Sequence, residues 1–138
     1  MSLSNDDRKA LVDYRIEKAY ASFEEAQKVA AISLWNLAAN RLYYALYHAA
    51  SALLLSDGFT SHTHKGLMSQ ISLNYVKEGK LLTDEGKLIR QMFNKRREGD
   101  YEDFEDTTEE EIAEAMPKVK ALVDRLISLN RIAATANR

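Results

Sequence analysis

The sequence predicts an all-α protein, specifically an up-and-down four-helix bundle with one additional short helix. Ala, Leu, Glu and Lys are abundant, whereas the chain contains only five glycines and one proline. This composition favours helix because glycine and proline are the residues that helix interiors tolerate least. Apolar residues also recur at alternating spacings of three and four along extended stretches, which is the periodicity of helices that pack together.

One stretch, Asn40–Leu55, is apolar around most of the helix that it predicts. Its two neighbouring stripes are Ala38, Leu42, Ala45, Ala49 and Ala52, and Ala39, Tyr43, Leu46, Ala50 and Leu53. A helix of this kind is buried in the middle of a bundle. It also carries polar groups that cost roughly 2–7 kcal/mol each when buried without partners. They are Asn40, Arg41, Tyr43, Tyr44, Tyr47 and His48. Either a hydrogen-bond network satisfies them or they line a cleft that a ligand enters.

The first and last helices are predicted from narrower apolar stripes. Ser4 or Asn5 is placed to cap the first helix, which should end near residues 31–35. Its stripe is Val12, Ile16, Ala19, Phe23, Ala26 and Ala30. Thr107 or Thr108, followed by three glutamates, predicts the start of the last helix. The stripe of that helix is Ile112, Ala115, Val119, Leu122, Leu126 and Leu129. Pro117 removes a backbone hydrogen bond inside it, so a kink or a restart is expected there.

Two shorter helices are predicted between them. Asp57-Gly58 should end the central helix near Ser56, and Thr63 is a plausible cap for a third helix over residues 64–78, closed by Gly79. The fourth helix is expected over residues 84–98, capped by Thr83 and stopped by Gly99, with residues 100–106 as an ordered loop.

Length and charge exclude several classes of protein. A chain of 138 residues predicts a single domain, with residues 1–4 and 132–138 frayed. Without cysteine there is no disulfide or thiolate metal site, and a cytoplasmic location is expected. The net charge of −2 argues against a broadly basic surface that coats nucleic acid. The longest apolar run is too short to span a bilayer. No Glu-x-x-His pair occurs, so neither a metal nor a cofactor is expected.

Histidines and a basic triplet are the candidate functional groups. His48 follows Tyr44 by one turn and Arg41 by two, which aligns a base, a phenol and a cation on one helix face. The alternative is that His48 is a hydrogen-bonded core residue. His62 and His64 are treated as residues of a polar loop. Lys95-Arg96-Arg97 either complements the helix dipole or binds phosphate through the arginine fork. The following residues, 98–114, hold ten acids and no basic residue, so any nucleic-acid contact must be local.

Four segments in this order resemble the HEPN domain family. They are NRLYYALYHAASALLL, THKGL, YVKEGKL and RREGDYEDF, and the similarity covers roughly Tyr20–Leu129. The resemblance implies a single helical HEPN-like domain over residues 1–138 that commonly forms homodimers. It also implies a minimal nucleotidyltransferase as partner, in pairs of the toxin–antitoxin type. Many HEPN proteins are metal-independent ribonucleases or descend from them.

The sequence departs from the nuclease members of that family at their catalytic motif. Those members carry an arginine and a histidine near the end of the bundle, with four to six residues between them, whereas no histidine follows His64 here. The spacing of Arg41 and His48 fits this motif, but both residues lie on the earlier helix.

The favoured interpretation is therefore a binding and regulatory module, associated with RNA or a nucleotide. Its candidate ligand residues are Asn40, Tyr44, His48, His64, Arg97 and Tyr101. A ribonuclease that uses His48 with Arg41, or His64, is the first alternative. A structural helical adaptor is the second.

Overall fold

The computed structural model describes residues 4–99 and 107–130, and of residues 96–99 it describes the backbone alone. Its helices are α1 (Asn5–Ala30), α2 (Trp35–Ser56), α3 (His64–Ile71), α4 (Thr83–Gly99) and α5 (Glu109–Ser128), and a π-helical segment, η1 (Ser72–Val76), directly continues α3. Helix is the only regular structure in these two ranges, so the predicted all-α class is confirmed. The loop expected at residues 100–106 and the frayed end after residue 131 lie outside the described ranges.

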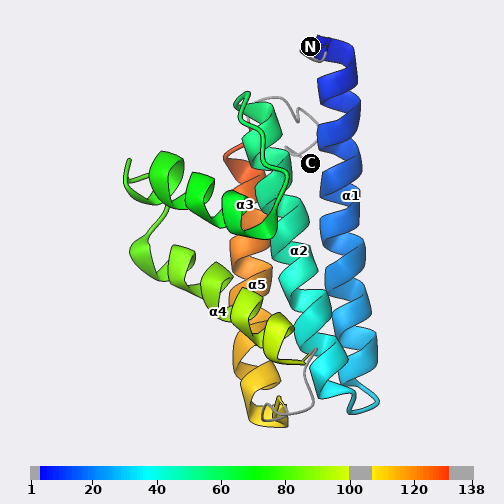
Figure 1. The fold of residues 1–138 in the computed structure, drawn as a ribbon. Helices are drawn as coiled ribbons and strands as arrows, with labels where there is room; N and C mark the ends of the chain where they lie inside the picture. The colour runs from blue at the N-terminus through cyan, green and yellow to red at the C-terminus, as the bar shows by residue number, and fades with distance from the viewer. Residues whose placement is uncertain (1–3, 100–106, 131–138) are drawn as a thin grey trace.

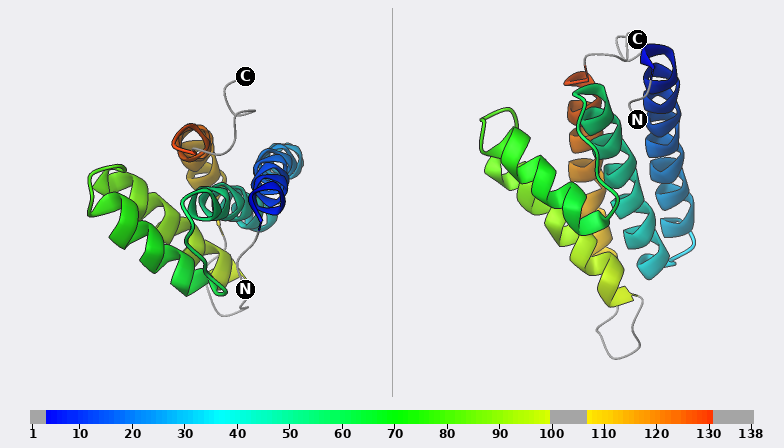
Figure 2. Two further views of the ribbon diagram at one scale, coloured as in Figure 1. Left: turned by 90° about the horizontal axis from the view of Figure 1, so that it is seen from above. Right: turned by 45° about the horizontal axis from the view of Figure 1, so that its top comes forward.

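The long helices α1, α2 and α5 lie side by side, with α2 between the other two (Figure 1). α3 and α4 form a tilted pair on a further side of α2, as the view from above shows (Figure 2). α2 consequently contacts each of the other four α-helices, and the core forms around it.

Burial of α2 agrees with its sequence pattern, because every residue of the two apolar stripes is buried. The helix begins earlier than the stretch at Asn40 that drew attention to it. It starts at Trp35, after Leu34, which offers no capping side chain. The chain turns there through Ser33, a non-glycine residue with a positive φ of 64°. The break between α1 and α2 therefore lies where the sequence predicts the end of the first helix, near residues 31–35.

The predicted third helix is two elements instead of one. α3 ends at Ile71 and η1 extends the turn to Val76. Leu67, Ile71 and Tyr75 are all buried, as predicted. An α-helix has 3.6 residues per turn, so the two four-residue steps from Leu67 to Ile71 and on to Tyr75 would gradually rotate the side chains away from one face. The wider π turn keeps Tyr75 on the buried side. There its hydroxyl donates to Asp57 Oδ2 at 2.5 Å.

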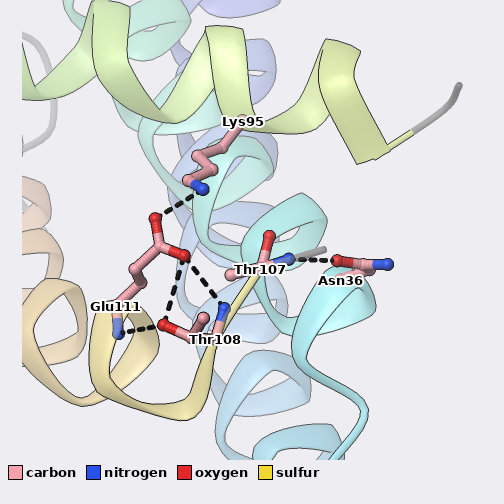
Figure 3. Close-up of polar contacts among 5 residues, drawn as sticks. All are labelled: Asn36, Lys95, Thr107, Thr108 and Glu111. Carbon is pink, nitrogen blue, oxygen red and sulfur yellow. Dashed lines mark hydrogen bonds and ion pairs between the residues drawn. The ribbon is translucent and has the colours of Figure 1, made fainter. Parts of the chain in front are cut away.

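The start of α5 joins three helices (Figure 3). Thr108 and Glu111 form the predicted capping box, each side chain bonding the backbone N–H of the other. The N–H of Thr107 donates to Asn36 Oδ1 on α2 at 2.8 Å, and Lys95 on α4 pairs with Glu111 at 2.5 Å. The cap therefore fixes α5 relative to its neighbours as well as starting the helix.

α5 runs unbroken past Pro117, so the expectation of a restart at this residue was wrong. Pro117 and Ala113, whose carbonyl loses its helical partner, are both exposed, so water can satisfy that carbonyl. At the other end of α5, buried Asn130 donates to the carbonyl of Ala52 at 3.1 Å. In the described part of the chain, no helix combines the length and apolarity needed to cross a bilayer.

Candidate functional site

α2 presents a row of rings that α3 and α4 extend. This ring cluster consists of Tyr43, Tyr44, Tyr47 and His48 from α2, His64 from α3 and Phe93 from α4. The closest ring centroids are those of Tyr47 and His64, 4.7 Å apart. Tyr44 and Tyr47 meet edge to face at 5.8 Å, within the range at which aromatic pairs attract. Tyr44 and Tyr47 are half-buried, so the cluster reaches the surface.

His64 is held inside the ring cluster and not in a loop. It is the first residue of α3, which Thr63 caps by accepting a hydrogen bond from the N–H of Gly66. Its Nδ1 shares a hydrogen bond of 2.5 Å with the hydroxyl of the fully buried Tyr43. The grouping of His64 with His62 as loop histidines is therefore corrected. His62 is exposed, whereas packing and the Tyr43 hydroxyl fix the position of His64.

His48 is paired with a residue that sequence reasoning did not select. Arg15 on α1 approaches His48 Nδ1 with Nη1 at 3.0 Å. Because a guanidinium only donates, Nδ1 accepts, and neutral His48 therefore carries its proton on Nε2. Burial, followed by the positive charges of Arg15, Lys18 and Arg41, lowers the pKa of His48 from 6.5 to about 4. His48 is thus a neutral hydrogen-bond donor at pH 7 and not a base poised near neutrality.

Arg41 lies over one of the tyrosines of the ring cluster. Its guanidinium carbon is 5.1 Å from the centroid of Tyr44, and two of its nitrogens donate to Asn40 Oδ1, at 2.7 and 3.1 Å. Glu25 forms a partly exposed ion pair with it at 3.3 Å. Asn40 thereby orients Arg41, which agrees with the selection of both residues from the sequence. Tyr44 lies between Arg41 and His48, its ring centroid 6.2 Å from that of His48.

Arg15 repeats this arrangement one turn further along α2. Its guanidinium carbon lies 5.7 Å from the centroid of Tyr47. Tyr44 and Tyr47, one turn apart on α2, thus each have an arginine guanidinium over the ring. Arg41 comes from α2 itself and Arg15 from α1. The sequence offered one signal for Arg15, namely its position at the edge of the Val12–Ile16 stripe. Which side chain it would meet across the helix interface is a matter of tertiary packing.

The structure brings together Asn40, Arg41, Tyr44, His48 and His64 among the residues selected from the sequence. The side chain of Arg97, on the last turn of α4, and all of Tyr101 lie outside the described residues. Lys95, which precedes Arg97 by two residues, is committed to Glu111.

A cavity of about 440 Å³ lies away from the ring cluster. α4 and α5 enclose it, and its wall includes the Lys95–Glu111 pair. Within residues 4–99 and 107–130, no three side chains of the metal-binding types come together. The ring cluster with its two arginines is therefore the candidate site.

Comparison with known proteins agrees with the resemblance seen in the sequence. A protein of Thermotoga maritima named "UPF0332 protein" is 28% identical over 124 residues, covering 90% of this chain and 94% of that protein. A Methanocaldococcus jannaschii protein named "Putative toxin" is 30% identical over 125 residues, covering 91% and 92% of the two chains. A second protein named in the same way from that organism is 26% identical over 63% of this chain. The family model described as "HEPN domain" matches residues 12–129, and the chain therefore belongs to the HEPN domain family.

Proposed function

We propose that this chain is a toxin-like HEPN module that binds single-stranded RNA through the ring cluster and its two arginines, without cleaving it. The toxin names of two relatives support the first part of the proposal. The observation that carries the second part is the placement of Arg15 and Arg41 over Tyr47 and Tyr44.

Arginines beside half-buried tyrosine rings are suited to bind single-stranded RNA. Guanidinium groups bind phosphate through paired N–H donors, and unstacked bases bind to aromatic rings and to arginine planes. No carboxylate in the described ranges pairs with Arg15, so its charge is available to an anion. His48 adds a neutral Nε2–H donor between the two arginines.

Binding without turnover follows from the state of His48. A general base works best with a pKa near the operating pH, whereas that of His48 is lowered to about 4. Its Nδ1 already accepts from Arg15. The late arginine–histidine motif of the nuclease members is also missing, because Glu102, Asp103 and Phe104 occupy the positions after Arg97 at which that motif has its histidine. These observations support the binding module over the metal-independent ribonuclease.

The wider setting is proposed from the family resemblance. A minimal nucleotidyltransferase is the proposed protein partner, and the pair would act in the cytoplasm. Arg97 stays in the proposal as an additional phosphate contact, since two arginines and a lysine occur together at residues 95–97.

The test measures binding and cleavage of labelled single-stranded RNA in EDTA. Arg15→Gln and Arg41→Gln should each weaken binding about tenfold, roughly equally for different sequences, because phosphate contacts carry no sequence information. Each change should also make the salt dependence shallower by about one phosphate contact. Arg97→Ala tests the third contact. Arg90→Gln, which removes an exposed arginine of α4, is the matched control.

Two outcomes would replace the proposal. Metal-independent cleavage that disappears in His48→Ala would make the chain a ribonuclease with Arg41 and His48 at its centre. Absence of RNA binding at physiological salt would favour the structural adaptor.

A further inference from the structure

A second cavity adjoins the ring cluster on its α1 side. It measures about 190 Å³ and is enclosed by α1, α2, the start of α3 and the loop that joins α2 to α3. Pockets for drug-sized ligands measure roughly 300–1,000 Å³, so this one suits a group the size of a single ring system.

The wall of this cavity combines aromatic, hydroxyl and cationic groups. Tyr47 and Phe59 provide rings, and Ser51, Thr60 and Ser61 provide hydroxyls that can bond the polar edge of a ring. No carboxylate lines it. Arg15 is the cationic residue of this lining. The cavity is therefore suited to a planar group that carries negative charge.

Arg15, which lines this cavity, has one donor without a hydrogen-bond partner. Its Nε is buried and has no hydrogen-bond partner among the described residues. A buried N–H of a charged group destabilises the fold when it is left unpaired, and in native proteins such a group calls for an explanation. Nη1 is taken by His48, while Nε belongs to the edge of the guanidinium that binds phosphate in a bidentate manner.

We propose that this cavity binds one unpaired nucleotide, with the base between the Tyr47 and Phe59 side chains and the phosphate on Arg15. The proposal rests on the proposed RNA-binding function and names the unit of RNA that the site selects. Arg15 and Tyr47 belong both to the cavity and to the candidate site. A strand that crosses the ring cluster therefore passes the mouth of the cavity and can place one base inside it. A base paired in a duplex cannot enter a space of this size.

The test compares ligands that share the phosphate but differ in the ring. Binding of the four nucleoside 5′-monophosphates, ribose 5-phosphate and inorganic phosphate is measured by calorimetry, and amide resonances are followed by NMR. At least one nucleoside monophosphate should bind ten times more tightly than ribose 5-phosphate and shift the resonances of Ser51 and Thr60. The free nucleoside without phosphate should bind at least tenfold more weakly than its monophosphate.

Two variants separate the cavity from the rest of the surface. Ser51→Phe fills the cavity and should abolish the preference for a nucleoside monophosphate over ribose 5-phosphate. Ser69→Phe, at an exposed position of α3, should leave this preference unchanged. Arg15→Gln should abolish the higher affinity for the nucleoside monophosphate than for the free nucleoside. This variant keeps the proposal testable if Ser51→Phe does not fold.

The outcomes distinguish this inference from the proposed function. Equal affinity for ribose 5-phosphate and every nucleoside monophosphate would overturn the cavity proposal, as would unchanged preference in folded Ser51→Phe. If single-stranded RNA still bound in either case, the proposed function would stand without the cavity. Nucleoside monophosphate binding that is lost in Ser51→Phe would support the cavity even if longer RNA failed to bind.

Discussion

Arg15 and His48 are 33 residues apart in the sequence, yet their contact decides the chemistry of the candidate site. Alone on α2, His48 is a candidate base with an ordinary pKa near 6.5. In the fold, burial and the guanidinium that α1 places at its Nδ1 keep the imidazole neutral, with its proton on Nε2. The contact therefore changes His48 from a candidate base to a donor.

The lowered pKa of His48 predicts a pH-dependent stability. Between pH 4 and 6.5 the unfolded chain binds the proton that folded His48 resists, so stability rises with pH across this window. This contribution is complete above pH 6.5 and is lost as the pH falls toward 4. Between pH 7 and 4.5, the free energy of unfolding should fall by on the order of 1–2 kcal/mol more in the wild type than in a variant that cannot titrate at position 48. This figure allows for the partial exposure of His48.

His48→Asn provides that comparison, because its amide oxygen can still accept from Arg15. Urea unfolding at several pH values should show a smaller loss of stability in His48→Asn than in the wild type. His62→Asn, which removes an exposed histidine, should follow the wild type. Parallel pH profiles for the wild type and His48→Asn would show that His48 is not the group that titrates.

At the scale of elements, α2 is the helix around which the others pack. Ala38, Ala45, Ala49 and Ala52 are fully buried, and their small side chains let neighbouring helices approach α2 closely. The alanines that the sequence shows as two stripes are thus sites of close packing. Leucine at such a site has no room unless the helices separate.

Ala45→Leu should accordingly destabilise the fold by about 1–3 kcal/mol through overpacking. The free energy of unfolding in urea measures this effect. Ala121→Leu is the matched control, because Ala121 is exposed on α5 and the same change there should alter stability by less than about 0.5 kcal/mol. A loss in Ala45→Leu no larger than in the control would mean that α2 is less tightly surrounded than the structure indicates.

At the scale of the whole molecule, exposed apolar residues gather where α1 turns into α2. Ile32 is 67% exposed, and Leu34 and Leu37 are 46% and 44% exposed. The family resemblance implies a homodimer, and Tyr44 and Tyr47 on α2 are the first aromatic residues to consider for its interface. The half-burial of those tyrosines within the ring cluster makes the α1–α2 turn the better candidate for an interface.

Light scattering at micromolar concentration should therefore report a dimer. Ile32→Glu should shift it toward monomer, because association would bury the new charge. Leu73→Glu is the control, since Leu73 is 57% exposed and lies in η1 instead. A wild-type monomer would contradict the prediction outright. Dissociation by Leu73→Glu alone would place the interface elsewhere.

The sequence by itself determined the class of fold, the burial of α2 and most of the helix caps. These features are local. Apolar periodicity selects the buried face of a helix, and side chains such as Thr63 and Thr108 bond backbone groups three residues away. The same local reasoning failed within the third helix, where tertiary packing selects a π turn.

Only the tertiary structure decided how the candidate site is assembled. Asn40, Arg41, Tyr44 and His48 could be selected together because one helix carries them all. Arg15, Phe93 and the second cavity could not, because they depend on which faces of α1, α3 and α4 meet α2. The physical reason is that a periodic pattern specifies which face is buried but not its partner. The partner sets the pKa of His48 and leaves the Nε of Arg15 unpaired.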